Sequence, residues 1–342
     1  MGGSEQQHVE LTFRAVDTGP TVSGRLPALF AAGWPAYRSW FLRDGEHARP
    51  SRADGEAALR RHLPELAPLY EELVDAVGDG DLQARFLSHW CPPPVATACS
   101  LAVWNRLDKV LVRSYDYPAA LCDTTAMASC WSAVGVLAMS DCLWGAVDGI
   151  NEHGLAVAIA FGGRPVVGPG FGIGLVVRYI LQVAGDAQQA LEILDRVPVS
   201  MAYNVAILDR AGTGAVVRVG PDRPTTLAPG LTAGNRQGRT EWPEHAASCA
   251  TVEREQVLAD AVADPRSTSD TLIGQFLRAP IQRDPATTAS GTVYTAAYRP
   301  DLGTLDLIWP DDRWRLSLRH LVEGQRPRQI LSVPPGLLAV PA

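Results

Sequence analysis

The run of short, strand-like segments after three consecutive prolines, residues 92–94, constrains the fold of this chain most. Five segments rich in apolar and β-branched residues follow, separated by turn-forming pairs such as Asp148-Gly149. Helical periodicity then returns over 171–197, with Asp186 as an expected N-cap, before further strands and helices. This order lacks a regular strand–helix alternation, so it predicts an α+β fold of antiparallel sheets covered by helices.

The first 90 residues have a different pattern. Apolar side chains recur at three- and four-residue spacing over 24–45 and 51–90, as on one face of a helix. Ser51 or Asp54 is expected to cap the second of these stretches. We therefore expect a helical N-terminal segment that precedes a sheet-rich body.

The composition excludes several classes of function. The net charge of −7 and the isoelectric point near 5.5 argue against a nucleic-acid-binding protein, which needs a basic face. No apolar run is long enough to span a bilayer, and the N-terminal residues lack the apolar core of a signal peptide. We therefore expect a cytoplasmic protein that binds neither nucleic acid nor membranes, with its six cysteines as free thiols.

The chain also lacks the patterns that common cofactors and metals need. Lys109 is the only lysine and lies in an expected hairpin turn, which argues against pyridoxal phosphate enzymes and P-loop nucleotidases. The glycines of "GPGFGIG", residues 168–174, do not have the spacing of a dinucleotide-binding loop. There is no C-x-x-C pair, and no histidine lies at metal-ligand spacing from another ligand. We expect neither a cofactor nor a metal.

Cys99 stands at the start of an expected strand, behind the rigid and small-residue stretch "PPPVATA". A hairpin turn centred between Leu107 and Asp108 pairs residues whose numbers sum to 215, and Cys99 then lies opposite Asp116. Directly opposed side chains share one face of the sheet, so this register brings a carboxylate beside the thiol, with Arg113 nearby.

A carboxylate raises the pKa of a neighbouring thiol, so Cys99 needs a base of its own. None of the seven histidines lies in a recognisable catalytic pattern, although a distant one could fold close to the thiol. The alternative base is the α-amine of Cys99, freed by cleavage of the bond after Ala98. Such an amine has a pKa of about 8 and is tethered next to its own thiol, and Asp116 would orient the ammonium that forms.

Several short motifs occur in order over residues 20–320, among them "ACSLAVWN", "VRSYDYP", "GAVDGINEHGLAVAIAFGGR", "YNVAILDRAG", "LTAGN" and "CATVERE". Together they resemble the acyltransferase and hydrolase family typified by isopenicillin N acyltransferase, within the N-terminal-nucleophile hydrolases. The resemblance implies a four-layer αββα sandwich and autocatalytic cleavage between Ala98 and Cys99. Residues 1–98 would be a helical segment that is released but stays associated, and residues 99–342 would be the catalytic domain.

The resemblance also implies roles for particular residues. By motif position, Cys99 is the nucleophile, Asp116 the carboxylate beside it, and Asn204 the side chain that binds the oxyanion. Arg113 and Arg254 match positions that bind substrate or support the site. The expected partner is a small acylated molecule, an amide or an acyl thioester, whose acyl group passes through Cys99 to water or an amine.

Two other hypotheses remain open at this stage. The expected junction reads Ala98-Cys99-Ser100, where family members commonly have Gly-Cys-Thr, so the chain could be an unprocessed, non-catalytic binding or scaffold protein of the same fold. It could also be a histidine-assisted cysteine hydrolase that acts without processing. Arg113 and Arg254 could equally be surface residues in salt bridges.

Overall fold

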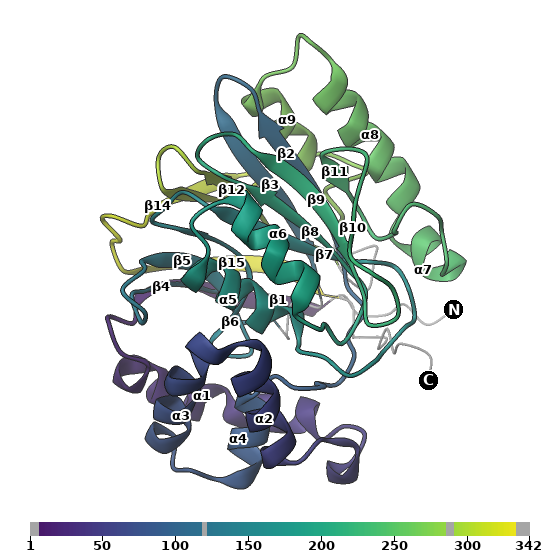
Figure 1. Ribbon diagram of the computed structural model, residues 1–342. Helices are drawn as coiled ribbons and strands as arrows, with labels where there is room; N and C mark the ends of the chain where they lie inside the picture. Colours follow the sequence, from purple (N-terminus) through teal and green to yellow (C-terminus); the bar gives the residue numbers. More distant parts are fainter. Residues whose placement is uncertain (1–6, 118–121, 285–290, 333–342) are drawn as a thin grey trace.

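The computed structural model describes residues 7–117, 122–284 and 291–332 (Figure 1). Its larger sheet has nine strands in the order β10-β9-β8-β7-β6-β5-β4-β1-β15. The bounds of these strands are β1 Gln7–Asp17, β4 Thr125–Ser129, β5 Val136–Asp141, β6 Gly145–Asn151, β7 Ala156–Phe161, β8 Tyr203–Leu208, β9 Gly214–Val219, β10 Thr226–Leu227 and β15 Gly324–Ser332.

The smaller sheet has six strands in the order β11-β2-β3-β12-β13-β14. Its strands are β2 Ala98–Asn105, β3 Lys109–Asp116, β11 Thr232–Ala233, β12 Thr292–Arg299, β13 Thr304–Trp309 and β14 Asp312–Ser317. Neighbouring strands are antiparallel throughout both sheets, except for the parallel pair β1 and β4.

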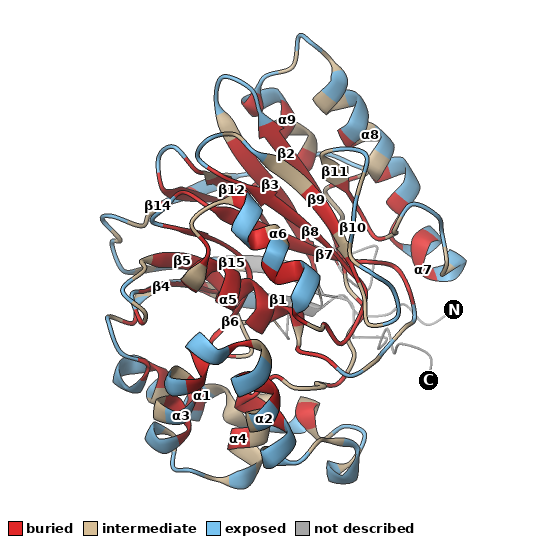
Figure 2. Cartoon of the chain, in the orientation of Figure 1, coloured by how far each residue is buried: buried red, intermediate tan, exposed pale blue. Residues whose placement is uncertain are grey.

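The two sheets pack face to face, and helices cover the outer face of each (Figure 1). Helices α5 (Ile173–Val183) and α6 (Ala187–Arg196) lie on the nine-stranded sheet, and α8 (Thr251–Ala263) and α9 (Ser269–Phe276) lie on the six-stranded sheet. Buried side chains fill the space between the sheets, and a second cluster fills the space beneath α8 and α9 (Figure 2). This architecture confirms the predicted four-layer αββα sandwich.

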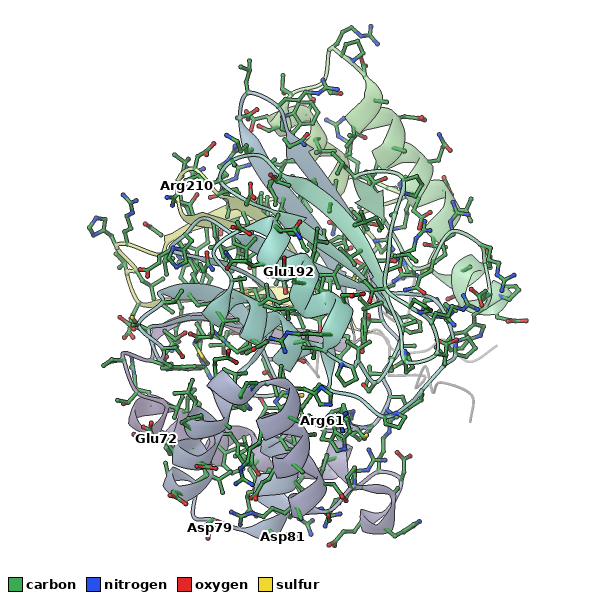
Figure 3. The ribbon with its side chains drawn as sticks, in the orientation of Figure 1. Arg61, Glu72, Asp79, Asp81, Glu192 and Arg210 are labelled. Carbon is green, nitrogen blue, oxygen red and sulfur yellow. The ribbon has the colours of Figure 1, made fainter. Side chains whose placement is uncertain are left out.

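The N-terminal segment contains the expected helices, α1 Val22–Phe41, α2 Arg52–His62, α3 Ala67–Ala76 and α4 Asp81–Leu87. Ser51 caps α2, as expected, and charged residues such as Arg61 and Asp81 lie on the outside of this helical group (Figure 3). The group packs against α5 and α6, where the Tyr179 hydroxyl donates to Glu65 Oε2 at 2.5 Å. Helix α5 is therefore covered on both sides, which explains its almost entirely apolar sequence.

Strand β1 was not predicted, and it lies inside the larger sheet. It pairs with β15 in antiparallel fashion over residues 7–15 and with β4 in parallel fashion over residues 14–17. Residues 1–98 are therefore not a purely helical appendage, because they supply one strand of the sandwich.

The predicted register of the β2–β3 hairpin is wrong by one residue. Asn105 pairs with Lys109, so the loop has three residues and opposed residue numbers sum to 214 instead of 215. The loop is fixed by its own contacts, since Trp104 Nε1 donates to Asp108 Oδ1 at 3.1 Å. Cys99 consequently lies opposite Tyr115, and Asp116 moves to the other face of the sheet.

The pair Asp148-Gly149 is also not a turn. Both residues lie in the middle of β6 and are buried. Glycine is required there because a Cβ atom on Gly149 would come within 2.6 Å of side-chain atoms of Ala138 and Leu181. The aspartate is retained inside the strand by partners in the six-stranded sheet, described below.

Candidate active site

Cys99 is the second residue of β2 and faces the space between the two sheets, with no exposed surface. Its backbone nitrogen donates a hydrogen bond to Oδ1 of Asn235 at 3.0 Å. Its Sγ atom lies 3.4 Å from Nη2 of Arg113, which donates to it. Both atoms that an N-terminal nucleophile would use, the nitrogen and the sulfur, are therefore held in fixed positions in the intact chain.

Arg113 connects the thiol with a buried acidic residue. Its Nη1 atom forms an ion pair with Asp148 Oδ2 at 2.5 Å, and Asp148 also accepts hydrogen bonds from the hydroxyls of Tyr294, at 3.0 Å, and Tyr298. Burial by itself lowers the pKa of Arg113, but the surrounding anionic groups outweigh this effect and hold that pKa well above its usual value. The guanidinium thus stays charged, and a positive charge beside Cys99 stabilises a thiolate.

Asn235 is a candidate site residue to which sequence reasoning assigned no role. Besides accepting from Cys99, its side chain donates through Nδ2 to the carbonyl oxygen of Phe161 at 2.9 Å. Its backbone nitrogen donates to Thr251 Oγ1 at 2.6 Å. The only signal for it in the sequence is its position at the end of "LTAGN", and Gly-Asn pairs are also typical of ordinary turns.

Asn204 holds the loop that carries Asn235. It lies in β8, and its Nδ2 atom donates to the carbonyl oxygens of Gly234, at 2.9 Å, and Arg236, at 3.0 Å. Both amide hydrogens of Asn204 are therefore used on the two residues that flank Asn235, which leaves neither free for an oxyanion. Asn235, and not Asn204, is therefore the asparagine whose side chain contacts Cys99.

Asp116 and Arg254 meet on the opposite face of the smaller sheet, both with no exposed surface. Their closest atoms, Oδ2 and Nη2, are 2.6 Å apart, and Thr292 Oγ1 donates to Asp116 Oδ1 at 2.7 Å. Arg254 also donates to Ser114 Oγ, which accepts from the backbone nitrogen of Ser100. Neither Arg254 nor Arg113 is a surface residue, and this network fixes β2 immediately after the expected junction.

His245 approaches the expected junction from helix α7 (Pro243–Ser248). Its Nε2 atom lies 3.1 Å from the carbonyl oxygen of Thr97, two residues before Cys99, and burial lowers the pKa of this imidazole. Within the described ranges, no histidine forms a hydrogen bond with the sulfur of Cys99. His245 thus contacts the chain two residues before Cys99 and not the sulfur itself.

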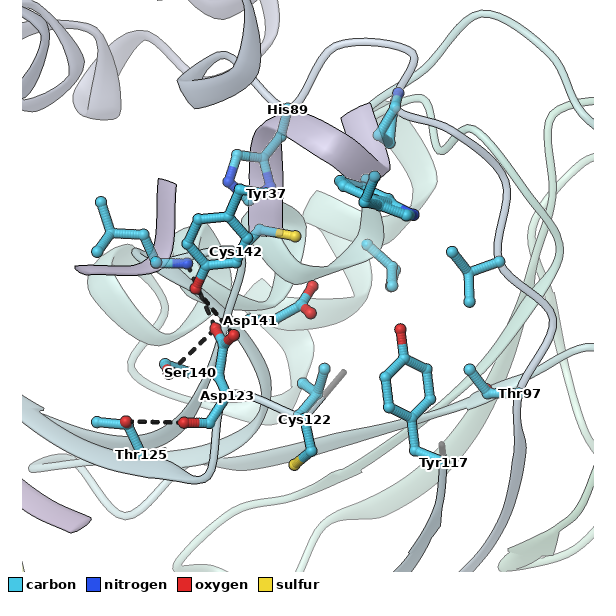
Figure 4. A pocket seen from close by; sticks show the side chains of 18 of the residues that line it. Tyr37, His89, Thr97, Tyr117, Cys122, Asp123, Thr125, Ser140, Asp141 and Cys142 are labelled. Carbon is cyan, nitrogen blue, oxygen red and sulfur yellow. Dashed lines mark hydrogen bonds between the residues drawn. The ribbon is translucent and has the colours of Figure 1, made fainter. Parts of the chain in front are cut away.

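A cavity of about 380 Å³ is lined in part by Arg113, the residue that contacts the sulfur of Cys99. Its wall also includes Tyr115 from β3 and, from the segment before Cys99, Pro92, Pro93 and Thr97. Helix α1 closes the opposite side, and Figure 4 shows the polar end of the cavity. Cavities of this size with a few convergent polar groups are typical small-molecule sites.

A family model matches residues 104–314, well over half of the chain, and its description is acyl-coenzyme A:6-aminopenicillanic acid acyl-transferase. The chain belongs to this family. Its reaction class is therefore acyl transfer, and the family acts on small acylated molecules. The match begins five residues after Cys99, so it includes Arg113, Asp116, Asn204, Asn235 and Arg254 but not Cys99 itself.

Solved structures of N-terminal-nucleophile hydrolases resemble the chain at low sequence identity. A mutant of the conjugated bile acid hydrolase from Clostridium perfringens is 12% identical with a TM-score of 0.48, over 67% of this chain and 96% of that one. Penicillin V acylase from Agrobacterium tumefaciens is 14% identical with a TM-score of 0.44, over 67% and 90%. The N-acylethanolamine-hydrolyzing acid amidase ortholog of Caenorhabditis elegans is 11% identical with a TM-score of 0.43, over 60% and 93%. No curated protein sequence matches the chain.

Two further findings concern the described part of the chain only. It contains no group of three or more histidine, cysteine, aspartate or glutamate side chains that could hold a metal ion. None of its helices is both long and apolar enough to cross a membrane.

Proposed function

We propose that this chain is a self-processing cysteine amide hydrolase or acyltransferase, with Cys99 as its N-terminal nucleophile. The observation that carries the proposal is the fixation of both reacting atoms of Cys99. Asn235 holds its nitrogen and Arg113 contacts its sulfur, at the wall of a cavity, in a member of an acyl-transferase family. Asp116, Arg254 and Asn204 act through other residues, by positioning the strand and the loop that carry these groups.

Processing begins when the sulfur of Cys99 attacks the carbonyl carbon of Ala98. The C–N bond between the two residues breaks, a thioester forms on the sulfur, and the nitrogen leaves as a free amine. Water then hydrolyses the thioester, which gives a carboxylate on Ala98 and restores the thiol. Asn235 Oδ1 keeps its partner throughout, because it accepts from the amide N–H before cleavage and from the amine afterwards.

Processing also opens the site. In the intact chain Cys99 has no exposed surface, and the stretch before it lines the cavity through Pro92, Pro93 and Thr97. Once the peptide bond is cut, this stretch is tied to β2 only by non-covalent contacts. Its displacement exposes the thiol to the cavity, where an acyl substrate binds.

Turnover then uses the α-amine as the base. It takes the proton from the thiol, the thiolate attacks the acyl carbonyl, and the ammonium returns the proton to the leaving amine. Arg113 stabilises the thiolate, and the second Nδ2 hydrogen of Asn235 is available to the oxyanion, since the first is used on Phe161. Water resolves the acyl-cysteine in hydrolysis, and a second amine resolves it in acyl transfer.

The released segment stays bound in this proposal. Strand β1 lies between β4 and β15 in the larger sheet, and α2 and the adjoining turn contact helices α5 and α6. Separating residues 1–98 from the rest would break nine antiparallel pairs with β15 and expose the apolar sides of α1 and α5. The mature protein is thus expected to remain a complex of its two fragments.

The first experiment is intact mass spectrometry under denaturing conditions on the wild type and on the variants Cys99→Ala and Cys249→Ala. Cys249 is the matched control, because it is the other fully buried free cysteine. The wild type and Cys249→Ala should each give two species that break between Ala98 and Cys99, and Cys99→Ala should stay intact. A single full-length species in the wild type would refute self-processing and favour the unprocessed binding protein.

The variant His245→Gln separates the proposed base from a histidine base. If the α-amine is the base, the processed variant keeps its hydrolytic activity on acyl amides and thioesters. The loss of the contact with Thr97 should at most displace the chain near Cys99 and lower that activity in part. Complete loss of hydrolysis in a correctly processed His245→Gln protein would instead favour a histidine-assisted thiol.

A further inference from the structure

We propose that the end of the cavity away from Cys99 binds a cationic group, so that the substrate is an acyl compound carrying an amine. The group that carries this inference is the carboxylate of Asp141, at the end of β5. The inference rests on the proposed function for the acyl part of the substrate, but the cation site itself is tested without any turnover.

Two carboxylates face this end of the cavity, and they differ in their partners. Asp123 accepts hydrogen bonds from the hydroxyls of Tyr37, at 2.8 Å, and Ser140, at 3.5 Å, and from the backbone nitrogen of Leu143. Asp141 has no hydrogen bond or ion pair with any described residue. Figure 4 shows its carboxylate pointing toward the middle of the cavity, between Asp123 and Tyr117.

The surrounding charges leave Asp141 uncompensated. Arg113 lines the same cavity, but its guanidinium is paired with Asp148. Arg14 lies at the edge, is exposed, and forms no ion pair with a described residue. Two carboxylates thus share one cavity, and neither of these arginines forms an ion pair with them.

A second unpartnered group lines the same space. His89 is only 6% exposed, and its Nε2 atom has no hydrogen-bond partner in the described part of the chain. Burial lowers the pKa of His89 to about 4, so at neutral pH its imidazole is uncharged. A neutral imidazole nitrogen can accept a hydrogen bond from an ammonium, as a carboxylate can.

The walls near Asp141 suit an ammonium more than a metal ion. Tyr37, Trp40 and Tyr117 line the cavity, and aromatic faces attract organic cations. Asp141 itself packs against the first turn of α5, where a Cβ atom on Gly174 would lie 2.5 Å from its Oδ2 atom. Burial raises the pKa of Asp141 to about 7, while the adjacent helix N-terminus favours the ionised form, which is the form that binds a cation.

The proposal also orients the substrate. Arg113 and Tyr115 mark the reacting end, next to Cys99, and Asp141 marks the cationic end. Apolar residues such as Met127, Ile159 and Met201 line the same cavity. A linear substrate would therefore place its amine at Asp141 and its acyl carbonyl at the thiol, with an apolar spacer between them.

The test is direct binding of 4-phenylbutylamine, with the neutral isostere 4-phenylbutanol as the control ligand. Titration calorimetry is done on wild type and on Cys99→Ala, so that binding is measured whether or not processing occurs. Asp141→Asn is the test variant, and Asp75→Asn is its matched control. Asp75 is an exposed residue on α3 whose carboxylate has no partner among the described residues. The amine should bind more tightly than the alcohol, and only Asp141→Asn should abolish that preference, with a loss of at least about tenfold in amine affinity.

A second measurement keeps the test valid if Asp141→Asn does not fold. On the unmutated protein the amine affinity should fall as the pH is lowered from 8 to 5, while the alcohol affinity stays constant. The titratable or charged groups that line the cavity with Asp141 are Arg14, Tyr37, His89, Arg113, Tyr115, Tyr117, Cys122, Asp123, Cys142 and Tyr203. Equal affinities for amine and alcohol, an unaffected Asp141→Asn variant, or no amine binding at all would each overturn the cation site, and none of these results depends on cleavage at Cys99.

Discussion

Replacing Arg113 tests whether one side chain supports both the fold and the nucleophile. In Arg113→Met, Asp148 stays buried with hydrogen bonds from Tyr294 and Tyr298 only. Removing one partner of a buried ion pair typically costs about 3–5 kcal/mol, because the remaining charge is uncompensated. A chain of 342 residues has an unfolding entropy of about 0.7 kcal/mol per kelvin, so the melting temperature should fall by about 4–7 °C.

The double variant Arg113→Met, Asp148→Asn separates the two roles. It removes the uncompensated charge but keeps an amide that both tyrosine hydroxyls can contact, so it should recover most of the lost melting temperature. It should not recover processing or acyl hydrolysis, because nothing restores the positive charge 3.4 Å from the sulfur of Cys99.

Scanning calorimetry at one scan rate, followed by intact mass and hydrolysis assays on the same samples, measures both effects. The Asp148→Asn single variant is the control for the loss of the acidic partner. An unchanged melting temperature in Arg113→Met would refute the electrostatic argument. Activity in the double variant close to that of wild type would refute a role of Arg113 at the nucleophile.

Three further predictions concern other parts of the site. Asn235→Ala removes the acceptor of the Cys99 nitrogen, so the rate of cleavage between Ala98 and Cys99, monitored by mass spectrometry, should fall by at least about tenfold. An unchanged cleavage rate would exclude Asn235 from the site. Asn204→Leu removes the hydrogen bonds that hold the loop of Asn235, so it should slow cleavage less than Asn235→Ala does. Slower cleavage in Asn204→Leu than in Asn235→Ala would assign the direct role to Asn204. Burial raises the pKa of Asp141 to about 7, so the folded state holds its proton more tightly than the unfolded chain and loses stability as the pH rises toward 7. Asp141→Asn should therefore gain about 3 kcal/mol over wild type between pH 5 and pH 8 in denaturant titrations, and a constant difference across that range would contradict it.

Local signals predicted much of the sandwich. The helices within residues 24–45 and 51–90, the Ser51 cap of α2, the helices within 171–197 and the Asp186 cap of α6 follow from short-range periodicity and capping chemistry, and all are present. These elements depend on residues within a few positions of one another, which is the range that sequence patterns describe.

The site was harder to predict because it depends on register and on contacts between distant segments. A three-residue loop in place of a two-residue turn shifted the β2–β3 pairing by one and turned Asp116 away from Cys99. The sequence pattern of Asp148-Gly149 is the same whether it forms a turn or a buried strand, and the partners that keep Asp148 in the strand, Arg113, Tyr294 and Tyr298, lie on the other sheet. Asn235 lies 136 residues from Cys99, beyond any local pattern.

The position of β1 also determines when the larger sheet can form during synthesis. Its nine antiparallel partners in β15 leave the ribosome more than 300 residues later, whereas the parallel pairing with β4 covers only four positions. A nascent chain can therefore assemble Cys99, Asn235 and Arg254 while β1 still lacks a strand on one side. Contacts so distant in sequence form slowly, because a long loop must close before they contribute any stability. Within the described ranges, β15 is the last strand to be synthesised, and its arrival completes the pairing of the N-terminal strand β1.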